Sequence, residues 1–333
     1  MNTSLGPDTI LVLNPHTAFS IYPERVVIES PDAVFTFVRR GAELVKRARF
    51  LLDGSHRLRD VSNRVGASHT ELEETFRDLV NERALEDVTR LLDSETPEQF
   101  LSEYFPLCDF WARDIFSTRF WQAMLNGNAT PELVLGWGFE FYHRVLGADE
   151  HNALSVNYCV DHQIREWLIS HFAEECDHGQ MFLDGMVASG FTIEQVAGSV
   201  PLPTSRALIN YLDVLAVTDT IAYLGCYGVM HSPRAGQTRQ RVGEQFDRFA
   251  QMYRFAQGLL EKIREHALLD LDLGHEGIVL ERALTERIKV NRAVTSSILG
   301  AMMGIVRAFS CFFEGIYEYY SKPGVPLPRS SAF

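Results

Sequence analysis

Cysteine is scarce in this chain, and its positions are never paired. The 333 residues contain five cysteines at scattered positions, with no CxxC spacing. An odd, dispersed set is typical of reduced thiols. The sequence therefore argues against a disulfide framework and against a thiolate metal site.

Positive charge is also in short supply. The chain has 31 Lys and Arg residues against 44 Asp and Glu residues, which gives a net charge of −13. Binding to nucleic acid or to an anionic membrane requires a basic surface. Neither partner is expected.

No targeting segment is apparent, and the longest apolar stretch is interrupted by a charged residue. The N-terminus MNTSLGPDTILVL has no basic stretch followed by an apolar run, so no signal peptide is apparent. The longest apolar stretch, 296–313, contains Arg307 and several small residues, which favours a buried helix over a membrane span. We therefore expect a cytoplasmic protein without a membrane partner.

The first ninety residues change from a strand pattern to a helix pattern. Residues 10–38 alternate, are rich in β-branched and aromatic residues, and are interrupted by prolines, which predicts short antiparallel strands. From Gly41 the period is helical, and GAELVKRARFLLDG is expected to end at its last glycine. Ser68, with Glu71 three residues later, forms a capping box for a further helix. This order predicts an α+β winged-helix-like domain over residues 1–90.

The same segment resembles the PqqD-like family. A helix ending in LLDG, a short helix LRDVSNRV and a longer helix ending near RALED carry the resemblance, which covers roughly residues 8–88. Such domains recognise the leader of a ribosomally made precursor peptide in natural-product biosynthesis. The resemblance implies that a leader docks between the last strand, Val34–Val38, and the third helix, Leu72–Val80.

Winged helices also bind DNA, which is the competing interpretation of this domain. The would-be recognition helix carries Glu71, Glu73 and Glu74, which would face phosphates with the wrong sign. A peptide that adds a strand to a sheet edge needs no basic surface. Peptide docking is therefore favoured over DNA binding.

After Asp93 the pattern is almost wholly helical. Helices are predicted at about 109–125, 131–147, 151–172, 171–189, 204–230, 239–271 and 276–320. The expected fold class is mainly α: the winged-helix-like domain is followed by an all-α helical bundle over 95–320 and an extended or disordered tail, 321–333.

Three acid-x-x-His pairs lie in the helical part. They are Glu140 with His143, Glu175 with His178, and Asp272 with His275. Residues three apart share a helix face, so a carboxylate and an imidazole at this spacing can hold one metal ion. A single pair is more often a solvated surface pair, but three in one helical domain indicate a metal site. Oxygen and nitrogen ligands without thiolate suit iron or manganese, whereas zinc sites usually use fewer carboxylates.

The order of these residues resembles the haem-oxygenase-like di-iron oxidases, relatives of the TenA and PqqC folds. In that family a Glu is followed some 35 residues later by Glu-x-x-His, and Glu140 stands in that relation to Glu175 and His178. The phrase FAEECDHG is close to the family's usual wording, and the resemblance covers roughly residues 95–320. It implies a non-haem enzyme that uses two Fe(II) ions, O₂ and an external reductant.

The chain departs from the family's pattern at two places. Where a third-helix Glu is expected, either His231 or Asp219 is available. The His-x-x-x-Asp-x-x-His run of the fourth helix is irregular: Asp272 and His275 fit its second half, and a local bulge would bring in His266. The metal ligands implied by the resemblance are Glu140, Glu175, His178, His231, His266, Asp272 and His275. Of these, Glu140, Glu175, His178, Asp272 and His275 are expected to carry the chemistry.

The domain order implies the substrate. A peptide-binding module in front of an oxidase suggests that a precursor peptide, docked through residues 1–90, is oxidised. Two alternatives stay open: a cofactorless PqqC-like oxidase of a small biosynthetic intermediate, and a non-enzymatic winged-helix regulator with a helical sensing domain. A homodimer is the default expectation for an oligomer.

Other histidines receive weaker assignments. His143 is expected to be a hydrogen-bonded core histidine or a residue that hydrogen-bonds to a ligand, and a ligand role is less expected for it than for Glu140. His171, four residues before Glu175, is expected on the same helix face, and it could equally be a residue bonded to backbone near a helix start. The remaining ones, expected in turns or at exposed positions, are His16, His56, His69, His151 and His162.

Overall fold

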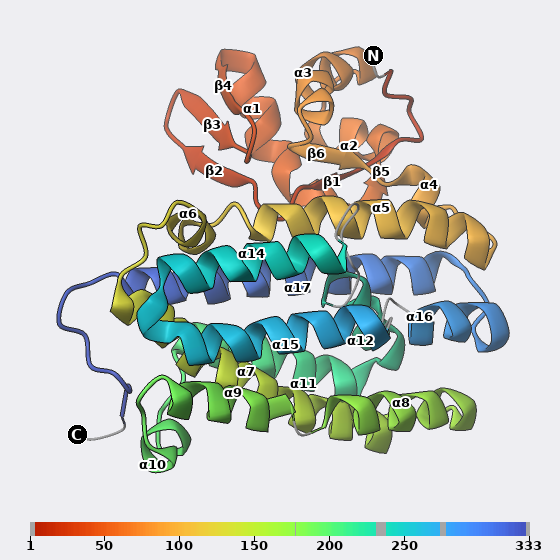
Figure 1. The fold of residues 1–333 in the computed structure, drawn as a ribbon. Helices are drawn as coiled ribbons and strands as arrows, with labels where there is room; N and C mark the ends of the chain where they lie inside the picture. The colour runs from red at the N-terminus through yellow and green to blue at the C-terminus, as the bar shows by residue number, and fades with distance from the viewer. Residues whose placement is uncertain (1–3, 177, 231–237, 274–277, 331–333) are drawn as a thin grey trace. The chain divides into compact units, whose positions relative to one another are not determined.

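The protein is seen here in a computed structural model that describes residues 4–176, 178–230, 238–273 and 278–330 (Figure 1). The side chains of residues 270, 272, 273 and 278 lie outside this description. The chain forms two compact units. The first comprises Met1–Leu107 with Ile288–Met303, and the second Cys108–Arg287 with Gly304–Phe333.

The first unit contains two three-stranded antiparallel sheets. One has the order β5-β1-β6 and the other β2-β3-β4. The strands are β1 (Ile10–Leu13), β2 (Ala18–Ile21), β3 (Arg25–Glu29), β4 (Val34–Val38), β5 (Asp53–Arg57) and β6 (Leu85–Asp87). The four strands predicted before residue 39 are present. The sequence did not predict β5 and β6, because DGSHR and LED are short and polar and become strands by pairing with β1.

The three predicted helices of this unit are present, but two of them end earlier than predicted. The helices are α1 (Arg39–Ala48), the 3₁₀ turn η1 (Arg49–Leu51), α2 (Leu58–Val65), α3 (His69–Asn81) and α4 (Thr89–Leu92). The third predicted helix, expected to end near RALED, ends at Asn81, and the short α4 was not predicted. The capping box of Ser68 and Glu71 at the start of α3 is confirmed. The helix expected to end at Gly54 ends at Ala48 instead. Gly54 lies in β5 with φ of +80°, where glycine is favoured, and a Cβ there would lie 3.0 Å from the Leu299 side chain.

Helices make up the second unit. They are α6 (Arg119–Leu125), α7 (Pro131–Tyr158), α8 (His162–Glu175), α9 (His178–Ala188), α10 (Ile193–Ala197), α11 (Pro203–Thr218), α12 (Thr220–Gly225), α13 (Tyr227–Met230), α14 (Arg239–Met252), η2 (Arg254–Ala256), α15 (Gln257–Leu273), α16 (Ile278–Arg282) and the π-helical turn η3 (Ala283–Arg287). Two further helices, α5 (Pro97–Ile115) and α17 (Arg292–Tyr320), contribute residues to both units. Within the second unit, α7 packs against α8, α9 and α11, and α9 packs against α15 (Figure 1).

Some helix boundaries differ from those predicted. The expected break near residues 147–151 is absent, because α7 runs without interruption from its Thr130 N-cap to Tyr158. The helix predicted over 204–230 is broken at Asp219, whose Oδ1 accepts hydrogen bonds of 3.0 Å from the amides of Ile221 and Ala222. This carboxylate caps α12.

The longest apolar helix, α17, is largely a core helix. By length and composition it could cross a membrane, yet half of its apolar window is buried within the protein. Ile305, Phe312 and Ile316 are fully buried. This placement agrees with the expectation of a buried helix. In the tail that follows, the carbonyl of Arg329 accepts a 2.9 Å hydrogen bond from the Val200 amide, so this part of the tail is held in place.

Candidate metal centre

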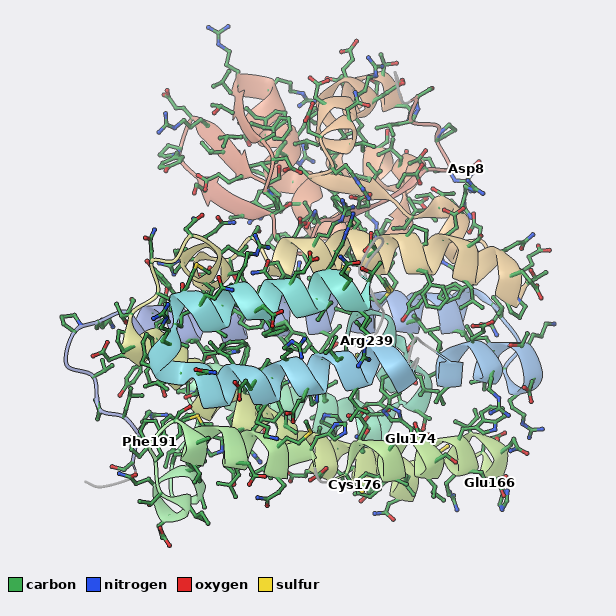
Figure 2. The ribbon with its side chains drawn as sticks, in the orientation of Figure 1. Asp8, Glu166, Glu174, Cys176, Phe191 and Arg239 are labelled. Carbon is green, nitrogen blue, oxygen red and sulfur yellow. The ribbon has the colours of Figure 1, made fainter. Side chains whose placement is uncertain are left out.

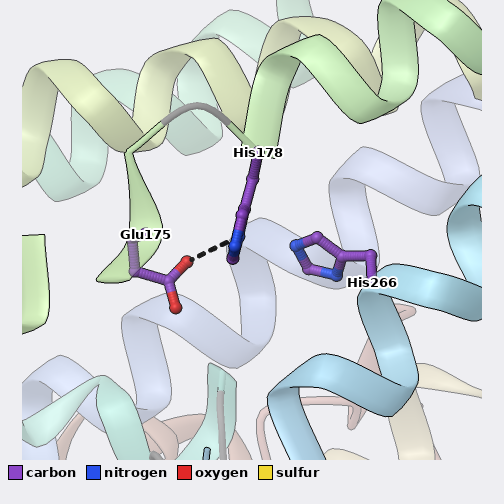
Figure 3. A group of neighbouring side chains, drawn as sticks. All are labelled: Glu175, His178 and His266. Atoms are coloured by element: carbon purple, nitrogen blue, oxygen red, sulfur yellow. Dashed lines mark ion pairs between the residues drawn. The ribbon is translucent and has the colours of Figure 1, made fainter. Parts of the chain in front are cut away.

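Three of the predicted ligands meet inside the helical unit. Glu175, His178 and His266 each offer one ligand atom, and these atoms lie within 4.8 Å of one another (Figure 3). Glu175 Oε2 lies 3.4 Å from His178 Nδ1. All three side chains are buried, with 7%, 7% and 8% of their surface exposed.

A helix break brings Glu175 and His178 together. Glu175 is the last residue of α8, Cys176 has an extended backbone with ψ of 147°, and His178 is the first residue of α9. The prediction that both share a face of one continuous helix is therefore wrong. The neighbouring Glu174 lies at the same end of α8 (Figure 2) but is exposed, so the last turn of this helix presents one buried and one exposed carboxylate.

His266 reaches the site from α15. Its ring lies 4.9 Å from the ring of His178, centroid to centroid, at an interplanar angle of 77°. The ring of Phe182 lies 5.3 Å from that of His266, and the ring of Phe141 lies 6.4 Å away. The His266 side of the site is thus bordered by aromatic surface, which strengthens electrostatic interactions by keeping water away.

This donor set fits a divalent transition metal. Burying a carboxylate beside two imidazoles is costly unless a cation or hydrogen bonds compensate. Two imidazole nitrogens and one carboxylate oxygen are also the ligands of the facial sites that bind Fe(II) in non-haem oxygenases, where other coordination positions stay open. A buried site able to hold a metal ion is therefore present.

Glu140 does not belong to this group. Its Oε1 accepts a 2.8 Å hydrogen bond from the Tyr320 hydroxyl, and its Oε2 accepts one of 2.9 Å from the Leu202 amide. The side chain is fully buried, and burial raises the pKa of its carboxyl group. These contacts give Glu140 a structural role in joining α7, α11 and α17. Its role as a metal ligand stays a prediction.

His143, the partner of Glu140 in sequence, faces Ser199. Its Nε2 lies 2.8 Å from the Ser199 hydroxyl oxygen. Burial lowers the pKa of His143 to about 4, so the imidazole is neutral at neutral pH. This arrangement matches the expectation of a hydrogen-bonded core histidine.

The remaining predicted ligands are not placed by the structure. His231 and His275 lie outside the described residues, as does the side chain of Asp272. Asp219, the alternative to His231, acts as the N-cap of α12.

The sequence analysis missed one buried histidine and allowed two interpretations of a second, His171. His151 was expected at an exposed position, but it is buried on α7, and its Nδ1 lies 2.7 Å from the Tyr223 hydroxyl. Burial lowers the pKa of His151 to about 3, and the charge of Arg144 acts in the same direction. The ring of His171 lies 4.9 Å from that of Tyr227. Recognising that α7 continues past residue 147 would have placed His151 inside the bundle.

The helical part has a haem-oxygenase-like, TenA-like fold, shared with solved structures of low sequence identity. A domain of unknown function with a haem oxygenase-like fold from Shewanella denitrificans superposes with a TM-score of 0.56 at 20% identity, covering 70% of this chain and 98% of that one. A TenA homologue from Pseudomonas syringae gives 0.51 at 13% identity, with coverages of 65% and 92%. A protein described as a TenA family transcription regulator from Silicibacter gives 0.50 at 14% identity, with coverages of 65% and 96%. No protein family model and no curated protein sequence matches the chain.

Proposed function

We propose that this protein is a non-haem iron oxidase that uses O₂ to modify a precursor peptide. The observation that carries the proposal is the buried set of Glu175, His178 and His266. A ferrous ion held by two imidazoles and a carboxylate supplies O₂ activation, because such a set leaves coordination positions open.

The carboxylate and the two imidazoles of the set have different tasks. The Glu175 carboxylate offsets part of the cation's charge in a buried environment, and the neutral imidazoles of His178 and His266 fix the position of the ion. The rings of Phe141 and Phe182 exclude water from the His266 side of the site. In this proposal His231, Asp272 and His275 provide ligands for a second iron.

The first test is metal binding. The full-length protein is loaded with Fe(II) under anaerobic conditions, and iron is counted per chain for the wild type, His178→Ala and His162→Ala. His162 is a matched control because its side chain is 83% exposed on α8. We expect stoichiometric iron in the wild type and in His162→Ala, and loss of iron in His178→Ala. Negligible iron in the wild type would overturn the proposal and favour a cofactorless oxidase or a regulator.

The proposed docking site for the peptide is the free edge of β4. Among the described strands β4 pairs with β3 alone, and Val34 and Val38 are exposed. The Ser30 amide donates a hydrogen bond to the Ala33 carbonyl. Hydrogen-bonded and non-hydrogen-bonded pairs alternate along an antiparallel ladder, so the pair of Val27 and Thr36 is not hydrogen-bonded, and the Thr36 amide points away from β3. An extended peptide can therefore hydrogen-bond to this edge.

On the third helix the docking face is smaller than the sequence resemblance implies. Leu72, Phe76 and Leu79 are all buried in the core of the first unit and are not available to a peptide. The proposal therefore relies on the backbone of β4 for affinity.

Thr36→Pro tests peptide docking. Proline removes the outward amide while leaving the ladder to β3 in place, so KM for a leader-bearing peptide should rise several-fold while a leaderless peptide is unaffected. Deleting residues 1–90 is a less specific test of peptide docking. It also removes the Gly54 carbonyl, which accepts a hydrogen bond from Arg292. Equal effects on both peptides would contradict leader docking.

A regulatory function is the second candidate. It is supported by the fold shared with the Silicibacter protein described as a transcription regulator. The regulatory function would be favoured if the protein retarded DNA from a random pool in an electrophoretic mobility assay and bound no iron.

A further inference from the structure

A continuous series of aromatic rings leads from the surface of the helical unit to the candidate metal centre. The ring of Phe116 stacks on Trp121 at 4.7 Å, and Trp121 lies 5.6 Å from Trp137. Trp137 lies 5.9 Å from Phe141, which in turn lies 6.4 Å from His266. The series joins the segment after α5 to α6, α7 and α15.

The two tryptophans differ in their access to solvent. Trp121 is 8% exposed and is the outer of the two tryptophans, whereas Trp137 is 1% exposed and lies further in. The innermost step ends on a predicted metal ligand, His266. The series therefore connects the half-buried ring of Phe116, through the two tryptophans, with the site itself.

Packing alone does not account for tryptophan at these two positions. The indole Nε1 atoms of Trp121 and Trp137 are buried and have no hydrogen-bond partner within the described residues. An unsatisfied buried donor costs about 1–3 kcal/mol, a cost that phenylalanine in the same ring cluster avoids. Indole differs from phenylalanine in being far easier to oxidise, which gives the two tryptophans a chemical use.

We propose that Trp137 and Trp121 carry oxidising equivalents away from the metal centre when O₂ is activated without substrate. This rests on the proposed iron oxidase function. One electron passes from Trp137 to an O₂-derived oxidant at the centre, one passes from Trp121 to Trp137, and one passes from an external one-electron reductant, such as ascorbate, to Trp121. The centre is reduced by one electron and the reductant is oxidised by one electron. The indoles return to their starting state, and no bond is made or broken along the route.

Peptide mapping after uncoupled turnover tests the route. The full-length protein is loaded with Fe(II) anaerobically, its iron is counted, and it is exposed to O₂ without substrate or reductant. Mass spectrometry then locates oxidised side chains. We expect several-fold more oxidised indole at Trp121 and Trp137 than at Trp167, which lies on α8 outside the series, and we expect ascorbate to suppress it.

Variants sharpen the result. In Trp137→Phe, oxidation should move to the residues at the centre, Phe141, His178 and His266, while Trp167→Phe should behave as the wild type. If iron binds and O₂ is consumed but Trp121 and Trp137 are oxidised no more than Trp167, the route is wrong and the oxidase proposal stands. If no iron binds, the oxidase proposal itself fails.

Discussion

Glu140 on α7 and Tyr320 at the end of α17 are joined by a buried hydrogen bond of 2.8 Å, although 180 residues separate them in the chain. The second oxygen of the same carboxylate is bonded to the Leu202 amide. One side chain thus ties together three segments that are distant in sequence.

Tyr320→Phe should therefore destabilise the protein. It leaves a fully buried carboxylate oxygen without its donor, which costs about 1–3 kcal/mol. Urea unfolding of the variant and the wild type measures the difference. No change in the unfolding midpoint would contradict the structural role of this pair.

Glu140→Gln separates a structural role from a metal-binding one. Burial raises the pKa of this carboxyl group, so between its ordinary and its raised pKa the folded state binds more protons than the unfolded state. Stability from this group is thus greatest at low pH and falls as pH rises through that window. In the Glu140→Gln variant, this decrease of stability with rising pH should be absent, and the variant should still bind iron. Loss of iron from a well-folded variant would show that Glu140 is a ligand, as the family resemblance implies.

Metal binding should stabilise the fold through Glu175. A ligand that binds only the folded state at 100 times its Kd adds about 2.7 kcal/mol. Fe(II) added anaerobically should raise the Tm of the wild type and of Glu174→Ala but not of Glu175→Ala. Glu174 is a matched control because it is an exposed carboxylate one residue away. An equal rise in all three proteins would place the metal elsewhere.

Two glycine substitutions should have opposite effects. A Cβ at Gly136 would lie 2.4 Å from the Tyr320 ring, which its bond to Glu140 holds in place, whereas a Cβ at Gly300 would meet nothing within 4 Å. Alanine improves helix propensity at both positions by about 1 kcal/mol. Overpacking should outweigh this gain at Gly136, for a net loss of roughly 1–2 kcal/mol, while Gly300→Ala is stabilised. Thermal unfolding of both variants checks the contrast.

Acid should destabilise the protein partly through His143. Its pKa is lowered from 6.5 to about 4 by burial, so the unfolded state binds more protons between these values. Stability from this group is complete above pH 6.5 and is lost as pH falls towards 4, by at most about 3 kcal/mol. His143→Gln can still bond Ser199 but cannot titrate. Its unfolding free energy should therefore fall less steeply over this range, and an unchanged slope would contradict the assignment.

Local sequence signals determined much of the secondary structure of this protein. Alternation before residue 39 specified four strands, Ser68 and Glu71 specified a helix start, and the helical period specified the character of the second unit. The sequence also identified Glu175 and His178 as a candidate ligand pair, and the structure brings their side chains together. These signals could be recognised because each depends on neighbours within a few residues.

Tertiary structure alone decided which residues meet. The break at Cys176 turns Glu175 and His178 towards each other, and the packing of α15 against α9 adds His266. The same packing encloses His151 and directs Glu140 to Tyr320. Helical spacing places a side chain on a face but does not state which distant face lies opposite. That choice depends on burial of apolar surface summed over the whole bundle, which no short segment encodes.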